Sequence, residues 1–213
     1  MDRRARLGSA RLYLVTPAIE QARLRAALAG GVDIVQLRIK DCESDAVLLA
    51  HAAVVREACA EAGALFILND RPDLVAAAGA DGVHVGQDDM QVAEARALVG
   101  ADRLVGLSTH TPEQVDAAQA SGADYIGVGP VHLTPTKPGR PAVGFDLVEH
   151  AAAHSSLPWF AIGGVDGETI AAVAAAGARR VAVVRAITES HDPQAAARAL
   201  RAAITEEAGV GIT

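Results

Sequence analysis

Aromatic residues make up only 3% of the 213-residue chain, and cysteine occurs only twice, at Cys42 and Cys59. So few aromatic rings disfavour a protein that binds nucleic acid by stacking bases on its side chains. The two cysteines lack the CxxC spacing of a metal site, so we expect free thiols in a reducing cytoplasm. Zinc sites of the CxxC type are therefore excluded.

Long apolar runs and an excess of positive charge are also absent. No segment approaches the roughly 18 to 20 apolar residues of a membrane span, and the first ten residues lack the apolar stretch of a secretory signal. The formal net charge of −7 disfavours a broad basic surface for nucleic acid, although a local pocket of Lys and Arg remains able to hold a phosphate ester. We expect a cytoplasmic protein with small-molecule ligands and with no nucleic-acid or membrane partner, and homo-oligomerisation stays open.

Eight short β-branched segments alternate with Ala-rich segments of helical period along the whole chain. This alternation predicts βαβ units and a parallel sheet, and eight units predict a single (β/α)8 TIM barrel over residues 1–213. Residues 1–10 would be a flexible or additional N-terminal segment. An open doubly wound sheet is the alternative, but its usual GxGxxG motif is missing after the first segment. The predicted strands are Leu12–Thr16, Ile34–Ile39, Leu65–Asn69, Gly82–Val85, Leu104–Leu107, Tyr125–Val128, Trp159–Ile162 and Val181–Val184.

A weak internal repeat accompanies these segments. Four predicted helices end in Gly, a small residue and a polar residue before the next strand, with the glycines at Gly31, Gly79, Gly122 and Gly177. Glycine suits the left-handed position that ends a helix. The spacing of the four glycines is irregular, which argues against a solenoid.

Two cations follow the second predicted strand. A period of two sends Gln36, Arg38 and Lys40 to one side, and Leu37 and Ile39 to the other. The carboxyl ends of barrel strands form the active face, so both cations are expected in its mouth. Because an unpaired buried cation is costly, the pair indicates either an anionic ligand or facing carboxylates that neutralise an edge.

Carboxylates follow the next two strands. Asn69 and Asp70 end the third strand, and the fourth runs into Asp88 and Asp89. Mg2+ takes one or two protein carboxylates and leaves its other positions to water and phosphate, so this arrangement favours a metal-diphosphate site. Helix capping by Asp70 and by Asp88 is the alternative interpretation of each.

Polar residues also end the later strands. Thr111 is the expected helix cap, which leaves Ser108 free at the strand tip to meet a phosphate oxygen. His84 is expected to face the barrel as a core histidine with satisfied hydrogen bonds. A long loop rich in proline and hydroxyl groups, residues 129–141, has the character of a binding loop. Nothing in the chain resembles a nucleophile with its base, which argues against a covalent enzyme intermediate.

The last two strands end where barrels commonly bind phosphate on backbone amides. Gly163 and Gly164 follow the seventh strand, and Val184 and Arg185 follow the eighth. A diglycine is a weak signal by itself, but its place after the seventh strand strengthens it.

Together these features resemble the thiamine-phosphate synthase family, also called thiamine-phosphate pyrophosphorylase. The resemblance runs from Leu12 to Ile187 and includes four specific motifs: QLRIKD from Gln36, ND at Asn69, HVGQDDM from His84 and GPVHLTPTK from Gly129. It implies a TIM barrel that joins 4-amino-2-methyl-5-hydroxymethylpyrimidine diphosphate to a thiazole phosphate and releases pyrophosphate by a dissociative mechanism.

The resemblance also implies the site residues. Those for the pyrimidine diphosphate are Gln36, Arg38, Lys40, Asn69, Ser108 and Lys137, of which Arg38, Lys40, Ser108 and Lys137 would be catalytic. Those for the Mg2+ cofactor are Asp70 and Asp89. Those for the thiazole phosphate are Thr134, Thr136, Gly164, Val184 and Arg185.

Two positions depart from the family pattern. Ile39 stands where an acid is common, but the pleat turns it away from the pocket. Arg185 stands where many relatives have a small hydroxyl residue, which leaves the thiazole phosphate contact open. Two rivals stay open as well: a thiazole tautomerase-like barrel without the diphosphate and metal residues, and a non-catalytic barrel that binds a phosphate ligand.

Overall fold

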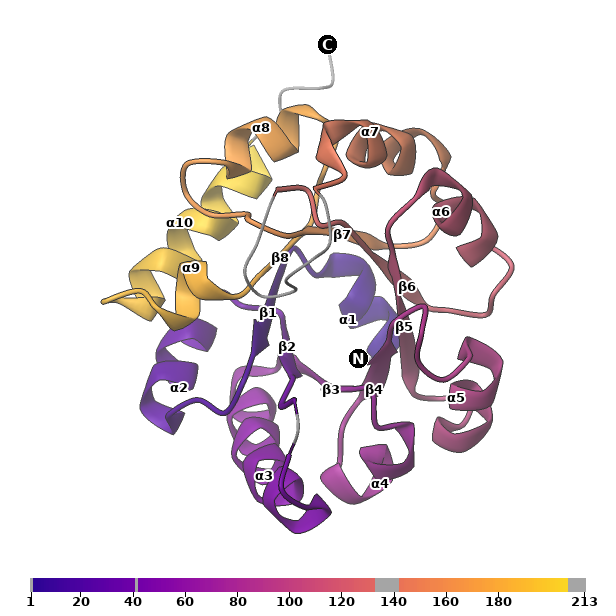
Figure 1. Ribbon diagram of the computed structural model, residues 1–213. Helices are drawn as coiled ribbons and strands as arrows, with labels where there is room; N and C mark the ends of the chain where they lie inside the picture. The colour runs from indigo at the N-terminus through magenta and orange to yellow at the C-terminus, as the bar shows by residue number, and fades with distance from the viewer. Residues whose placement is uncertain (1, 41, 133–141, 207–213) are drawn as a thin grey trace.

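The computed structural model describes residues 2–40, 42–132 and 142–206, and its strands form a closed barrel of parallel strands in chain order (Figure 1). The final strand pairs with the first, which confirms the α/β barrel and excludes an open doubly wound sheet. The strands are β1 (Leu12–Thr16), β2 (Ile34–Leu37), β3 (Leu65–Asn69), β4 (Gly82–Val85), β5 (Leu104–Thr109), β6 (Tyr125–Val128), β7 (Trp159–Ile162) and β8 (Val181–Val183).

Apart from α1, the helices surround the barrel on its outer side (Figure 1). None of the helices in the described residues is long and apolar enough to cross a membrane. They are α1 (Arg3–Ser9), α2 (Gln21–Ala29), α3 (Asp45–Ala62), the 3-10 turn η1 (Pro72–Leu74), α4 (Val75–Ala78), α5 (Val92–Val99), α6 (Pro112–Ala118), α7 (Gly144–His154), α8 (Ile170–Ala175), α9 (Arg185–Thr188) and α10 (Pro193–Glu206).

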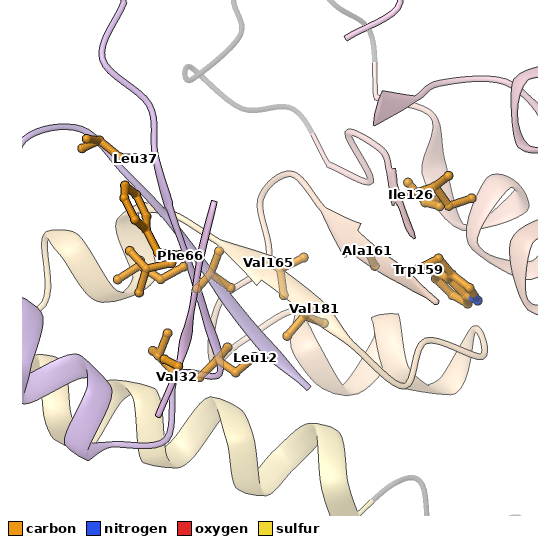
Figure 2. Packing of buried hydrophobic residues seen from close by; sticks show 14 of the residues in the cluster. Leu12, Val32, Leu37, Phe66, Ile126, Trp159, Ala161, Val165 and Val181 are labelled. Carbon is orange, nitrogen blue, oxygen red and sulfur yellow. The ribbon is translucent and has the colours of Figure 1, made fainter. Parts of the chain in front are cut away.

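Alternation along the strands divides the apolar side chains between two cores. In β1, Leu12 and Leu14 point outward into the layer between barrel and helices, whereas Tyr13 and Val15 point into the barrel. Figure 2 shows part of the outer layer, with Leu12 near Val181 of the neighbouring strand. A barrel whose interior is filled with side chains leaves room for a ligand only at its mouth.

The weak internal repeat has a structural role at the base of the barrel, the end at which the strands begin. Each of three aspartates that precede a strand accepts a backbone N–H of the strand before it: Asp33 from Leu12 at 3.0 Å, Asp81 from Phe66 at 3.0 Å and Asp124 from Val105 at 2.8 Å. The four glycines of the repeat have positive φ, as expected for residues that end a helix. The repeat thus joins neighbouring strands at the barrel base.

Helix α1 covers this base, and Figure 1 shows it through the ring of strands. Its Leu7 is buried and packs in the same cluster as the side chains inside the barrel. Arg3 and Arg4 form ion pairs with two of the base aspartates, Asp81 at 2.8 Å and Asp124 at 2.9 Å. Residues 3–9, part of the segment expected to be flexible or additional, therefore form a helix that closes the barrel.

Candidate active site

A cavity of about 600 Å3 opens at the carboxyl ends of the strands. Thr134, Thr136 and Lys137 lie outside the described residues, and every other residue that the sequence predicts for the site lines this cavity. These are Gln36, Arg38, Lys40, Asn69, Asp70, Asp89, Ser108, Gly164, Val184 and Arg185.

The cationic side of the cavity follows β2, which ends at Leu37, two residues earlier than expected. The backbone nevertheless continues along β1, since the Arg38 N–H donates to the carbonyl of Thr16 at 2.8 Å. The pleat therefore persists past the strand end, and Gln36, Arg38 and Lys40 all face the cavity. Gln36 is buried, Arg38 is half-buried and Lys40 is exposed. The charge of Arg38 therefore lies in the cavity wall, and that of Lys40 lies at the rim.

The two acidic residues on the facing loops are held by short local contacts. Asp70 has a positive φ of 58°, uncommon for a residue with a side chain, and its N–H donates to the carbonyl of His84 at 2.9 Å. The Asn69 amide donates to the Asp70 carboxylate. The Asp89 carboxylate accepts the N–H of Gly86 at 2.8 Å, and a Cβ on Gly86 would lie 2.6 Å from the same oxygen. Glycine at 86 is therefore required for this placement.

The electrostatics of this acidic pair are unfavourable without a cation. Desolvation, followed by the charge and hydrogen bond of Asp89, raises the pKa of Asp70 to about 6, while Asn69 and Arg38 act in the opposite direction. The two carboxylates are thus close enough to share a proton. Such a pair at a cavity mouth is a common feature of functional sites.

The residues present fit a Mg2+ ion that is held in part by its ligand. Both side chains offer oxygen atoms only, which a hard cation prefers. Within residues 2–40, 42–132 and 142–206, no group of three or more His, Cys, Asp or Glu side chains forms a metal site made of protein alone. Two carboxylates plus phosphate and water are sufficient for Mg2+.

Ser108 lies inside β5, which continues to Thr109, and the expectation of a free hydroxyl at the strand tip is wrong. Its Oγ lies 2.9 Å from Nε2 of His84. The other ring nitrogen of His84 lies 3.3 Å from the hydroxyl of Tyr125, which confirms a core histidine with hydrogen-bond partners. Ser108 still reaches the cavity wall.

Glycines form the opposite wall, between β7 and β8. Gly163 and Gly164 both have positive φ, and a Cβ on Gly163 would lie 2.5 Å from Cβ of Pro130. The Thr169 hydroxyl donates to the carbonyl of Gly164 at 3.0 Å, and the Asp166 carboxylate accepts the Thr169 N–H at 3.0 Å. We did not predict these two supporting residues, although an Asp three residues before a Thr is a sequence signal for such a turn.

Of the helix caps considered from the sequence, one is confirmed. The Thr111 side chain accepts the N–H of Gln114 and caps α6. Gln91, rather than Asp88, precedes α5, because a turn separates Asp88 from the helix. Asp70 also caps no helix, since Arg71 precedes η1. The capping alternative for both acidic residues is therefore wrong.

The fold and the cavity define a structural class, a (β/α)8 barrel with cations, paired carboxylates and a diglycine turn at its mouth. Residues 12–187 match the family model described as thiamine monophosphate synthase. Relatives named thiamine-phosphate synthase are 50% identical over 198 residues in Synechocystis sp. and 49% identical over 216 residues in Mycobacterium tuberculosis. This chain belongs to the thiamine monophosphate synthase family.

Coverage of these relatives differs. The alignments cover 92% of this chain with the Synechocystis protein and 94% with the M. tuberculosis protein. The chain spans 57% of the Synechocystis protein but 97% of the mycobacterial one. Among solved structures, a thiamine phosphate pyrophosphorylase from Pyrococcus furiosus is similar with a TM-score of 0.86 and 29% identity, over 97% of this chain and 99% of that one.

Proposed function

We propose that this chain joins a hydroxymethylpyrimidine diphosphate to a thiazole phosphate, which yields thiamine phosphate and pyrophosphate. The observation that carries the proposal is the placement of Arg38, Asp70 and Asp89 around one cavity mouth. Cations and paired carboxylates in one site suit a diphosphate with its metal ion, whereas a single phosphate needs neither carboxylate.

The pyrimidine diphosphate is assigned to the wall formed by β2 to β5. Arg38 and Lys40 face the cavity and would neutralise the diphosphate, and Asn69 and Ser108 offer it polar contacts. Gln36, at the bottom of this wall, would contact the pyrimidine. Lys137 is assigned to the same substrate from the family motif, and it lies outside the described residues.

The metal site is assigned to Asp70 and Asp89, which would hold Mg2+ through carboxylate oxygens. A bound Mg2+ ion would supply Lewis-acid stabilisation of the negative charge that develops on the leaving pyrophosphate. Asn69 and Gly86 keep the two carboxylates in place through the contacts described above.

The thiazole phosphate is assigned to the opposite wall. Gly164, Val184 and Arg185 face the cavity there, and the positive φ of Gly164 lets the backbone approach a ligand closely. Thr134 and Thr136 complete this set from the family motif and lie outside the described residues.

The proposed reaction breaks the bond between the pyrimidine methylene carbon and the diphosphate oxygen. Pyrophosphate leaves with the bonding electrons, and the thiazole nitrogen then gives its lone pair to the methylene carbon. No proton is transferred in these steps, so the site needs positioning and charge stabilisation rather than a general base. We place the reaction in the cytoplasm, where the free thiols of Cys42 and Cys59 stay reduced.

The test is pyrophosphate release from the purified chain with both substrates and Mg2+. We expect release only when both substrates are present and its loss in EDTA. Asp89→Asn should raise the Mg2+ concentration for half-maximal rate at least about tenfold, because a hard cation loses one of two protein carboxylates. Asp116→Asn, a surface aspartate paired with His150, is the matched control and should behave as the parent chain.

The rival functions predict different results in the same assay. A thiazole tautomerase-like barrel would isomerise the thiazole without the pyrimidine substrate and without Mg2+. A non-catalytic barrel would bind a phosphate ligand with no turnover. Equal rates with and without EDTA, or no pyrophosphate release, would reject the proposed reaction.

A further inference from the structure

A chain of hydrogen bonds crosses the barrel interior beneath the cavity. The Gln36 amide donates to the Tyr13 hydroxyl at 2.7 Å, and that hydroxyl lies 2.9 Å from the hydroxyl of Tyr125. Tyr125 lies 3.3 Å from Nδ1 of His84, whose Nε2 lies 2.9 Å from Oγ of Ser108. Five side chains from five strands thus link two residues that the proposed function places on the pyrimidine diphosphate.

Strand register and two glycines make this chain possible. Gly106 pairs with His84 on one side and with Tyr125 on the other, so the two rings meet over a position without a side chain. A Cβ on Gly106 would lie 2.2 Å from Cζ of Tyr125 and 2.6 Å from Nδ1 of His84. Gly127, beside Ser108 in the register, similarly faces the His84 ring.

One assignment of donors and acceptors gives every proton along this chain of hydrogen bonds an acceptor. The nitrogen of Gln36 can only donate, so the Tyr13 oxygen accepts and its own proton is available to Tyr125. Tyr125 then donates to Nδ1 of His84, which places the histidine proton on Nε2, facing Ser108. Burial raises the pKa of both tyrosine hydroxyls, so both stay protonated at neutral pH.

We infer that His84 is a positioning residue, which Tyr125 holds as the Nε2–H tautomer. The Nε2–H group then donates a hydrogen bond to Ser108, and the hydroxyl proton of Ser108 points into the cavity. Ser108 would then donate to an acceptor atom of the substrate. A hydroxyl oriented in advance costs no reorganisation when the substrate binds or reacts. The use of that hydroxyl in turnover rests on the proposed function, whereas the tautomer is a property of the protein alone.

The first test reads the tautomer without any substrate. Long-range proton–nitrogen correlation spectra of the purified chain at about pH 8, where an ordinary histidine is neutral, distinguish Nε2–H from Nδ1–H. The His84 signals are assigned by their loss in His84→Gln. We expect Nε2–H in the parent chain and a shift toward Nδ1–H in Tyr125→Phe, which removes the donor to Nδ1. An Nδ1–H form in the parent chain would overturn the inference.

The second test is a double-mutant cycle on pyrophosphate release. Tyr125→Phe keeps the ring and should lower kcat/KM about tenfold, the loss expected for one hydrogen bond in a dry site. Because the effect passes through Ser108, Tyr125→Phe should cause no further loss when Ser108→Ala is already present. A full second tenfold loss in the double variant would overturn the role of Ser108.

Phe160→Leu is the packing control, because Phe160 stacks edge-on against both tyrosines without a hydrogen bond. Its effect, whatever its size, should be the same with and without Ser108→Ala. Thermal unfolding of each variant confirms that it is folded. If the parent chain releases no pyrophosphate, the proposed function fails, and the tautomer spectra still decide whether the hydrogen-bond chain has the inferred direction.

Discussion

The carboxylates of Asp70 and Asp89 come within hydrogen-bonding reach of each other at the mouth of the barrel, and each is also held by a local donor. Two like charges in contact destabilise a folded chain unless a proton or a cation lies between them. This arrangement therefore opposes the stability of the metal-free protein, and the divalent cation of the proposed function would relieve the repulsion.

Asp70→Asn should separate the repulsion between the two carboxylates from their binding of a cation. The pKa of Asp70 is raised to about 6, so the folded chain binds more protons than the unfolded chain between about pH 4 and 6. Stability is therefore lost as pH rises through that window, and the carboxylate destabilises the fold at neutral pH. In EDTA at neutral pH, we expect Asp70→Asn to raise Tm by about 1 to 3 °C, because solvent at this exposed residue screens the repulsion.

The same variant should lose its response to the metal. The parent chain should gain Tm when Mg2+ and pyrophosphate are added together, and Asp70→Asn should gain much less. Near pH 4, where the parent carboxyl is largely protonated, the Tm difference in EDTA should disappear. A lower Tm of the variant than of the parent in EDTA at neutral pH would contradict the repulsion.

Gly86→Ala tests the placement of Asp89. The added Cβ would lie 2.6 Å from Oδ2 of Asp89, so the carboxylate must move away from the backbone N–H that holds it. We expect the Mg2+ concentration for half-maximal pyrophosphate release to rise roughly tenfold, the range seen when groups that support a metal ligand are lost. Gly8→Ala, where a Cβ meets nothing within 4 Å, is the matched control. An unchanged Mg2+ requirement in Gly86→Ala would show that Asp89 does not need this position.

Arg38→Ala tests the cationic wall. Arg38 is half-buried beside the two carboxylates and would face the departing pyrophosphate. Loss of a charge fixed in advance should lower kcat on the order of 10²-fold. The control is Arg25→Ala, which removes an exposed arginine of α2 that pairs with Glu61 of α3 and does not line the cavity, and it should leave kcat unchanged. If only KM rises in Arg38→Ala, the residue contributes equally to ground-state and transition-state binding.

Asp124→Asn should affect stability but not catalysis. The Asp124 carboxylate is nearly buried at the barrel base, where it pairs with Arg4 and Arg96 and accepts the N–H of Val105. Its neutralisation should lower the free energy of unfolding by about 2 to 4 kcal/mol, measured by urea denaturation. At a temperature where the variant is folded, kcat and KM should match those of the parent. A reduced kcat in the folded variant would mean that the base communicates with the mouth.

The barrel could be predicted because its strands are short apolar segments between glycine-ended helices. Five of the eight predicted strands have the observed ends, including β1 and β3. The second strand was predicted too long, since the hydrogen bond of Arg38 to Thr16 continues the extended backbone without a full ladder. Period two still identified the cavity-facing residues there, because side-chain direction depends on local backbone geometry alone.

The hydrogen-bond chain could not be predicted in the same way. Inward positions for Tyr13, His84 and Tyr125 follow from period two, but their meeting depends on how the closed barrel aligns distant strands. Ser108 was assigned correctly to the cavity wall and wrongly to a free strand tip, since its partner comes from a neighbouring strand. The turn after β4 was likewise not predicted, so the sequence did not indicate that Gln91, rather than Asp88, precedes α5.

Arg185 is the point at which this chain departs from the family pattern. Its side chain is exposed, borders the main cavity and also borders a smaller one of about 450 Å3 that Arg38 lines as well. Among the described residues, no carboxylate forms an ion pair with its guanidinium. A guanidinium at the wall assigned to the thiazole phosphate is suited to a direct, bidentate contact with that phosphate, which is one of two possible roles; a purely structural role is the other.

Arg185→Ser distinguishes the two roles. If the guanidinium contacts the phosphate, the change should raise the thiazole-phosphate KM several-fold and leave the pyrimidine-diphosphate KM nearly unchanged. The effect should shrink at high salt, since the pair is accessible to solvent and therefore screened. Arg185→Lys is the matched control, because it keeps the charge but loses the bidentate geometry. Its thiazole-phosphate KM should lie between those of the parent chain and Arg185→Ser. An unchanged thiazole-phosphate KM at low salt in Arg185→Ser would eliminate the contact and leave only the backbone of this turn to hold the phosphate.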